Sequence, residues 1–419
     1  MFAAVGAVLI VAACTSSSAN PPPSTITVPP TSTPATSDDN MLKIGVLLPS
    51  NGEGASIGQS ARAAIREAVT LANNSPGKVL GQNVMLMESN EGADAVSALT
   101  MLQTLIDKHV DVLIGPASSN NLIALAPKIV NAGIAACSPS ASALALDNFP
   151  DRGLLFRTIP SDGLEAEAMA RVIERTGESS VAIAYVDDGY GRPMEAELRS
   201  ALHTLGITVD DSLGYKVDDD EFNEEAAQLV SAGQGALAII GDPDAGPRLL
   251  AAMFDDLQGK SARDIVVNDA MRHPWPIGLV DARAKTSSEV MGVSPQVTTQ
   301  SSDLLALIRQ QDSAATGLFA TQAYDCANLF MLAAEKAGST NSGQIAGQVP
   351  NVSAGGSQCT TFRSCQQLLR EGRNIDYDSP GAQLTLGSSG DPSVGVYDEF
   401  TFDDTGRDVS RQTVTVTDS

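Results

Sequence analysis

Aromatic residues and positive charges are both scarce in this sequence. Phe, Trp and Tyr make up 4% of its 419 residues, whereas hydrophobic residues as a whole reach 43%. Lys and Arg total 26 against 50 for Asp and Glu, which gives a formal net charge of -24. Such a field repels phosphate backbones, so we expect no nucleic-acid partner. Small aliphatic side chains must build the interior, as in α/β proteins, and the length favours two lobes.

Signatures of catalysis are also missing. The sequence has three His residues, none in a recognisable nucleophile motif, and it has no G-x-S-x-G. The spacing Gly52-x-Gly54-x-x-x-Gly58 resembles a dinucleotide loop but is one residue too long. We therefore expect a protein that is not an enzyme and that needs neither a cofactor nor a metal. An exported hydrolase is the weaker alternative.

An apolar N-terminal run ends at Val11-Ala12-Ala13-Cys14. Small residues before a Cys resemble a bacterial lipobox, and the run is too short to span a bilayer. Residues 15–40 are mostly Ser, Thr, Pro, Ala and Asp, which predicts a disordered tether. We therefore expect residues 1–14 to be a lipoprotein signal, with Cys14 lipidated at the extracytoplasmic face of the cell membrane. No Lys or Arg precedes the run, which leaves open a start further upstream or a segment that is not a signal.

Four further Cys residues suit an oxidising compartment. Cys359 and Cys365 lie in a polar stretch without a nearby His or further Cys, so we interpret them as a local disulfide and not as metal ligands. Cys137 and Cys326 lie in apolar surroundings. We expect these two to be buried as small hydrophobic side chains, with a bridge between them left open.

Strand-like apolar runs alternate with helical periodicity from residue 41 onward. The first strand is expected at 42–48, and the alternation restarts near Arg157 to give a second unit of similar size. A strand is also expected at 289–293, and residues 381–417 show β-type alternation. The order strand, helix, strand implies right-handed crossovers and mostly parallel sheets.

Several motifs in this order resemble type I periplasmic binding proteins, specifically the leucine/isoleucine/valine-binding family of ABC importers. The resemblance implies two doubly wound parallel-sheet lobes of α/β class, joined by a three-segment hinge. Lobe 1 would comprise 41–157 and 290–380, and lobe 2 would comprise 158–289 and 381–419. The matching segments are Lys43–Pro49, Ile114–Ser119, Ser138–Ser142, Phe156–Thr158, Asp187–Gly191, Ala323–Asp325, Glu335–Gly338 and Asn374–Asp378.

The family places its ligand between the lobes, at the carboxyl ends of strands. After the strand that ends near Ile114, Ser118 and Ser119 begin a helix whose free N–H groups and dipole favour a carboxylate. By resemblance Ser119 is the hydroxyl that binds the ligand carboxylate; from the residues alone a plain helix cap is equally suitable. The resemblance also places the Ala141 carbonyl and the Ser142 hydroxyl against the ligand ammonium and carboxylate.

From the second lobe, Tyr190 would cover the ligand across the cleft. Two departures from the family bear on specificity. Ile57 stands where an aromatic residue is frequent, and Asp242 stands in a loop where Tyr is frequent. Asp242 and Asp269 are candidates to pair with a ligand ammonium, so a basic or polar amino acid, or an amide, also fits.

The resemblance implies that the protein captures an amino acid or a similar small molecule by lobe closure and delivers it to an ABC permease in the membrane. A ligand-sensing receptor domain of the same fold, without a transport role, is the strongest alternative.

Overall fold

The computed structural model describes one compact unit within Thr33–Ser419. Apart from Met1, the described residues are 40–52, 54–272, 274–296, 299–381, 384–387 and 389–417. The lipidation site and nearly all of the tether predicted from the sequence lie outside them.

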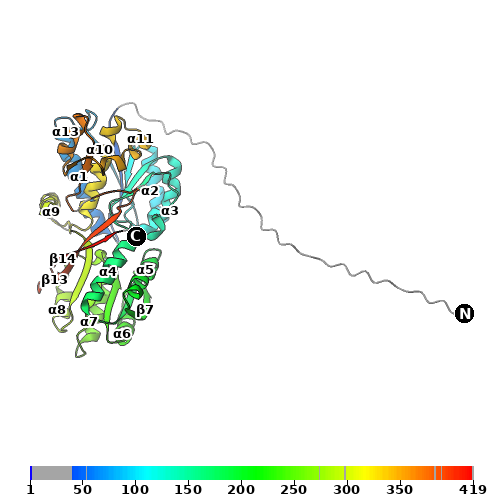
Figure 1. Cartoon of the computed structure of the whole chain (residues 1–419), viewed down its shortest axis with the longest axis vertical. Coiled ribbons are helices and arrows are strands. Elements are labelled where there is room, and N and C mark those ends of the chain that lie inside the picture. Colours follow the sequence, from blue (N-terminus) through cyan, green and yellow to red (C-terminus); the bar gives the residue numbers. More distant parts are fainter. Residues whose placement is uncertain are drawn as a thin grey trace. The chain divides into compact units, whose positions relative to one another are not determined.

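The first sheet lies in the part of the molecule where Figure 1 labels α1, α2 and α3. It has five parallel strands in the order β2-β1-β3-β4-β5. Its strands are nearly all buried except for β2, which fits the apolar runs expected of a parallel sheet covered by helices. The strands are β1 (Lys43–Leu48), β2 (Met85–Asn90), β3 (Val112–Ile114), β4 (Ala135–Ser138) and β5 (Leu155–Arg157). The helices that connect them are α1 (Ala55–Asn73), α2 (Ala95–Asp107) and α3 (Ser119–Ala132).

The second sheet has seven strands in the order β14-β13-β10-β9-β8-β6-β7. Five of them are parallel and repeat the strand order of the first sheet, whereas β13 and β14 form an antiparallel hairpin on one edge. The strands are β6 (Ser180–Val186), β7 (Thr208–Tyr215), β8 (Ala236–Ile240), β9 (Ile265–Val267), β10 (Val290–Pro295), β13 (Val394–Phe402) and β14 (Asp408–Thr417). The accompanying helices are α4 (Asp162–Thr176), α5 (Gly191–Thr204), α6 (Asn223–Ser231), α7 (Ala245–Leu257) and α8 (Ile277–Arg283).

One predicted lobe boundary is wrong. The sequence placed residues from 290 onward in the first lobe, but β10 pairs in parallel with β9 and antiparallel with β13. The chain therefore returns to the first lobe only after Pro295. The elements that follow are α9 (Thr299–Gln311), α10 (Ala320–Ala337), α11 (Ser342–Ala346), α12 (Val349–Val352), β11 (Ser357–Cys359), α13 (Phe362–Arg370) and β12 (Ile375–Tyr377).

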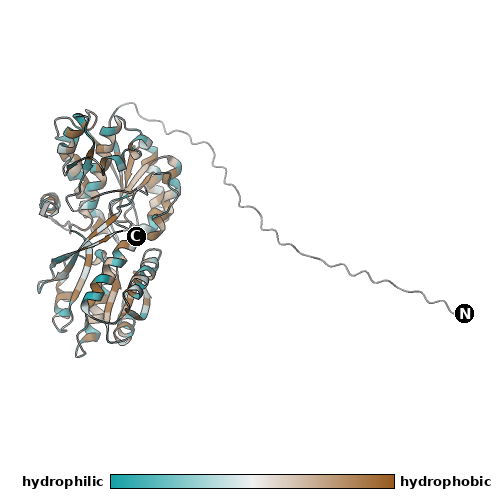
Figure 2. Cartoon of the chain, viewed as in Figure 1, coloured by the Kyte–Doolittle hydropathy of each residue, from teal (hydrophilic) through white to brown (hydrophobic). Residues whose placement is uncertain are grey.

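Small side chains let the helices of the first lobe approach closely. Helix α1 buries a stripe of Ala and Ile against the core, and α10 is buried over nearly its whole length. Figure 2 shows the hydrophobic colour concentrated on the strands that these helices cover. Gly115 directly follows β3 and has φ of 100°, and a Cβ there would lie 2.0 Å from the Leu47 carbonyl oxygen. Only glycine fits this approach of the site loop to β1. Among the described residues, no helix has the length and apolar character needed to span a membrane.

Three chain segments cross between the lobes and lie together around Arg157. The Arg157 backbone N–H donates to the Gly390 carbonyl at 3.0 Å, and its guanidinium pairs with Asp391 at 2.7 Å and Asp147 at 2.6 Å. The Gln296 N–H donates to the Val396 carbonyl at 3.0 Å. These contacts join the end of β5 to the segment before β13, and the segment after β10 to β13 itself, as the three-segment hinge requires.

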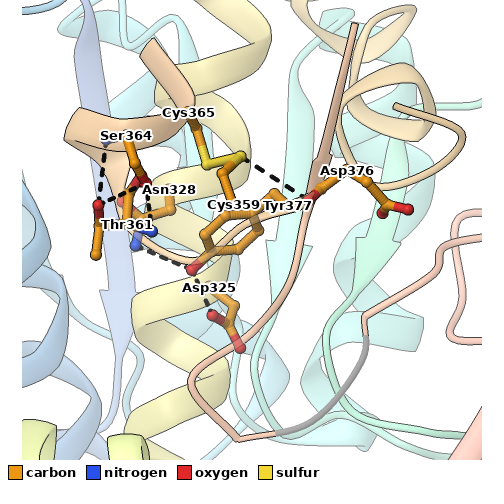
Figure 3. Close-up of a disulfide and its surroundings, with 8 residues drawn as sticks. All are labelled: Asp325, Asn328, Cys359, Thr361, Ser364, Cys365, Asp376 and Tyr377. Carbon is orange, nitrogen blue, oxygen red and sulfur yellow. Dashed lines mark hydrogen bonds between the residues drawn. A yellow bond between two sulfur atoms is a disulfide. The ribbon is translucent and has the colours of Figure 1, made fainter. Parts of the chain in front are cut away.

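Two disulfides reinforce the first lobe. Cys359–Cys365 links β11 to α13, in agreement with the local pairing predicted from the sequence (Figure 3). Beside it, the Tyr377 hydroxyl donates to Asp325 at 2.7 Å. Cys137 and Cys326 are also bonded, and they tie β4 to α10. The expectation of free buried thiols at these two positions is therefore wrong, although both are fully buried as predicted.

Removing the short disulfide should lower stability modestly. For Cys359→Ala/Cys365→Ala we expect the free energy of unfolding to fall by about 2 kcal/mol, because the bridge closes a loop of few residues. Urea denaturation of the variant and of wild type, both with Cys137–Cys326 intact, measures this difference. Free thiols at both positions in non-reduced peptides of the exported wild type would show that the bridge does not form.

Candidate functional site

A cavity of about 210 Å³ lies between the two sheets. Its walls come from the segments that follow β1, β2, β3 and β4 in the first sheet and β6, β8 and β9 in the second. In each sheet the strand order reverses beside the first strand, between β1 and β3 and between β6 and β8. Open α/β sheets bind ligands at such switch points, at the carboxyl ends of the strands. The cavity lies at this place in both sheets.

Seven of the eight residues proposed from the sequence as ligand contacts line this cavity. The exception is Ala141, which is fully buried and lies outside the lining. The cavity therefore gives no support to the predicted contact between the Ala141 carbonyl and a ligand ammonium. The seven lining residues are Ile57, Ser118, Ser119, Ser142, Tyr190, Asp242 and Asp269.

The N-terminus of α3 is partly occupied by a carboxylate of the protein itself. Glu91, which directly follows β2, accepts from the backbone N–H of Ala117 at 2.7 Å and of Ser118 at 3.1 Å. The Asn121 amide also donates to Glu91, at 2.8 Å. Burial raises the pKa of Glu91 to about 7, although these three hydrogen bonds stabilise the charged form and lower the pKa. Glu91 was not among the residues predicted from the sequence.

Two backbone N–H groups at the start of α3 donate to no acceptor in the described part of the chain. Ser118 is the N-cap, and its hydroxyl accepts from the Asn121 N–H at 3.4 Å. The backbone N–H groups of Ser119 and Asn120 donate to no other described residue. The Ser119 hydroxyl accepts from the Ala143 N–H at 3.3 Å and retains its own proton for donation. The first turn of α3 can therefore still bind an anionic group, next to Glu91.

Tyr190 is held in place from behind. The Asn268 amide donates to the Tyr190 hydroxyl at 2.8 Å and to the Gly241 carbonyl at 3.0 Å, while its oxygen accepts from the Gly241 N–H. Asn268 is fully buried and follows β9 directly. It therefore fixes the orientation of an aromatic wall of the cavity, a role that the sequence analysis missed.

Two further carboxylates of the second lobe cap their own helices. Asp242 accepts from the N–H groups of Asp244 and Ala245 at the start of α7. Asp188 accepts from Tyr190 and Gly191 at the start of α5, and also from the Asn120 side chain of the first lobe at 2.9 Å. The Asn120–Asp188 bond joins the lobes across the cavity. Asp242 is satisfied locally, which makes it the weaker of the two predicted ammonium partners.

Asp269 belongs to a buried group of carboxyl side chains. It is 5% exposed and lines the cavity, and its backbone N–H donates to the Glu165 carboxylate at 2.8 Å. Burial raises the pKa of Asp269 and of nearby Asp162 to about 7, and burial together with both neighbours raises the pKa of Glu165 well above its usual range. In the described part of the chain no Lys or Arg forms an ion pair with Asp269. A ligand cation at this place would therefore meet an uncompensated carboxylate.

Comparison with known proteins identifies the family. A family model described as periplasmic binding protein matches residues 41–354. The chain belongs to the periplasmic binding protein family. Its relatives are solute-binding proteins and not enzymes, and the type I resemblance seen in the sequence is confirmed. The chain is 26% identical over 370 residues to the chemotactic signal transduction system substrate-binding protein BasB of Halobacterium salinarum, covering 84% of this chain and 85% of BasB.

Solved structures share the fold of this binding protein at low sequence identity. The leucine-binding protein LivK of Thermotoga maritima has a TM-score of 0.73 at 16% identity, covering 89% of this chain and 99% of LivK. LivJ of Streptococcus pneumoniae in complex with isoleucine has a TM-score of 0.71 at 17% identity, covering 90% and 100%. A solute-binding protein of R. palustris in complex with benzoate has a TM-score of 0.74 at 16% identity, covering 90% and 98%.

Proposed function

We propose that this binding protein captures an amino acid or a similar small carboxylate in the cavity between its lobes and delivers it to an ABC permease. The cavity supports this most directly, because lining residues from both lobes would contact one ligand. A ligand that touches both lobes stabilises the closed arrangement. Isoleucine and benzoate, the ligands of two structural neighbours, share a carboxylate.

The ligand carboxylate would lie at the first turn of α3. It would accept from the backbone N–H groups of Ser119 and Asn120 and from the hydroxyls of Ser119 and Ser142. The ammonium would pair with Asp269, and Tyr190 would close over the side chain. Delivery by the lipid-anchored protein would occur at the extracytoplasmic face of the membrane.

Loss of either hydroxyl should weaken binding measurably. For Ser119→Ala and for Ser142→Ala we expect a loss of roughly 1.5–3 kcal/mol, because each hydroxyl would donate to a charged group. That corresponds to a loss in affinity of about tenfold to a hundredfold. Calorimetric titration with the tightest-binding amino acid measures it, with Ser200→Ala on the exposed side of α5 as the matched control. Unchanged affinity in both cavity variants would remove the carboxylate assignment.

Anchoring depends on Cys14 in this proposal. Full-length protein expressed in a bacterial host should partition into detergent and carry acyl mass, whereas Cys14→Ser should be released from the membrane fraction. Wild-type protein without acyl mass in the soluble fraction would refute the anchor and leave ligand capture untouched.

A sensing role is the second candidate, and the name of BasB supports it. Uptake of labelled ligand by cells with and without the gene separates the two roles. Loss of uptake in the deletion strain supports transport, whereas normal uptake with a lost response to the ligand supports sensing.

A further inference from the structure

The cavity has carboxyl groups on both of its sides, and none of the described residues that line it is basic. Glu91 contributes from the first lobe, and Asp188, Asp242 and Asp269 contribute from the second. Two of these carboxyl groups are almost completely removed from solvent, Glu91 at 1% exposure and Asp269 at 5%. Burying a carboxyl group is unfavourable unless a partner stabilises its charged form, so a partner for each has to be identified.

Helix N-termini supply partners for three of the four groups. Glu91 lies at α3, Asp188 at α5 and Asp242 at α7, where each accepts backbone N–H groups. A helix terminus carries about half a positive charge, so each of these sites keeps a negative excess. An anionic ligand side chain would therefore meet three helix ends that are already occupied by acids of the protein.

Asp269 is the group without such compensation. Its carboxyl group faces the N–H of Ala270, and within the described ranges no side chain donates a hydrogen bond to it. It lines the cavity and is 5% exposed, so a ligand in the cavity can reach its carboxyl group. In the described part of the chain, both carboxyl oxygens of Asp162 are buried without a hydrogen-bond partner, and the Ser142 hydroxyl lowers the pKa of Asp162 against its burial.

Basic side chains near these acids are engaged elsewhere. Arg272, which lines a second cavity together with Asp269, is bound to Asp398 and Asp408. Arg62 lies behind Glu91, but its guanidinium donates to the carbonyls of Leu48 and Ser89 and is the weakest of the influences on Glu91. Arg157 is bound to Asp391 and Asp147 at the hinge. None of these three lines the cavity between the two sheets.

Aromatic walls complete a surface suited to a positive group. Tyr190 lines the cavity from the second lobe and Phe319 from the segment before α10. Phe319 is 7% exposed and is held with φ of 52°, in the left-handed region that residues other than glycine seldom occupy. Aromatic faces attract organic cations.

We infer that the cavity selects an amino acid with a positively charged side chain, with Glu91 as the buried determinant of that preference and Asp269 as the partner of the α-ammonium. The inference rests on the proposed capture of an amino acid. The α-ammonium of the ligand would pair with Asp269 of the second lobe only. A second cationic group, on the ligand side chain, would pair with Glu91 of the first lobe.

Isosteric ligand pairs test the charge preference without any change in the protein. The full-length chain is titrated by calorimetry with lysine and norleucine, and with arginine and citrulline, at pH 8. In each pair we expect the cation to bind at least about tenfold more tightly, since a hydrogen bond to a charged group is worth that much. In Glu91→Gln the advantage of lysine over norleucine should fall at least about threefold, whereas Glu197→Gln, on the exposed side of α5, should leave it unchanged.

The outcomes separate this inference from the proposed function. Equal affinity for the members of both pairs overturns the charge preference and leaves amino-acid capture intact. A preferred cation whose advantage survives in Glu91→Gln overturns the assigned residue. Binding of no amino acid overturns the inference, and binding of no small carboxylate of any kind overturns the proposed function as well.

Discussion

Replacing Asp269 by Asn should lower the affinity for the amino-acid ligand by roughly thirtyfold to several thousandfold. Removing one partner of a buried charge pair costs about 2–5 kcal/mol, because the other charge remains desolvated and unpaired. The side chain lines the cavity at 5% exposure and has no basic partner in the described part of the protein. Asn has nearly the same shape, so packing against Ala270 and Glu165 should persist.

Calorimetry on Asp269→Asn and on wild type at pH 8 measures this loss. Glu197→Gln removes a carboxylate from an exposed helix face and should bind as wild type does. Because burial raises the pKa of Asp269 to about 7, wild-type affinity should also rise from pH 6 to pH 8, and this rise should be smaller in Asp269→Asn. An affinity within twofold of wild type would show that the ammonium lies elsewhere.

Asp162 should make the ligand-free protein less stable as the pH rises. Burial raises its pKa from the ordinary 3.8 to about 7 in the folded protein. Its contribution is therefore fully present below pH 4, where both states are protonated, and is lost as the pH passes through 7. A shift of this size corresponds to about 4 kcal/mol between pH 4 and pH 8.

The variant Asp162→Asn isolates that contribution. Urea denaturation at pH 4 and pH 8 measures the free energy of unfolding of the variant and of wild type. From pH 4 to pH 8, the variant should gain several kcal/mol of stability relative to wild type. The groups that face Asp162 are the Ser142 hydroxyl, the acids Asp269, Asp147 and Glu165, and Arg157, and all of them are present in both proteins. A difference that does not change with pH would mean that Asp162 is already ionised or solvated when folded.

The sequence was sufficient to predict both parallel sheets because their strands are apolar runs between helical segments. It assigned β10 to the wrong lobe, since Val290–Pro295 has an apolar pattern that indicates a strand but not the sheet it joins. Helix α7 was not predicted. Gly246 and Pro247 near its start are turn signals, although Pro is tolerated in the first turn of a helix.

The candidate site was predicted in outline because loops after parallel strands meet at one edge. Its buried acids were missed for a different reason. Asp162 and Glu165 stand in the first turn of α4, where acids are ordinarily solvent-exposed, and only packing against residues far along the chain buries them. The Cys137–Cys326 bond spans 189 residues, a pairing that composition and spacing do not specify.

Glu91 illustrates how such a residue could be found earlier. It follows an exposed edge strand and precedes Gly92, which reads as an ordinary polar turn. Its position at the carboxyl end of β2, beside the predicted helix at Ser118, was the available signal. An acid that directly follows a strand of a doubly wound sheet is therefore a candidate site residue, even where it lies in a polar turn.

The crystal structure of the protein grown with the amino acid that calorimetry ranks first tests the central claim most directly. We expect the ligand in the cavity between the lobes, with its carboxylate within hydrogen-bonding distance of the Ser119 and Asn120 N–H groups and its ammonium against Asp269. A saturating ligand bound outside this cavity, or bound there with its carboxylate directed away from α3, would contradict the account.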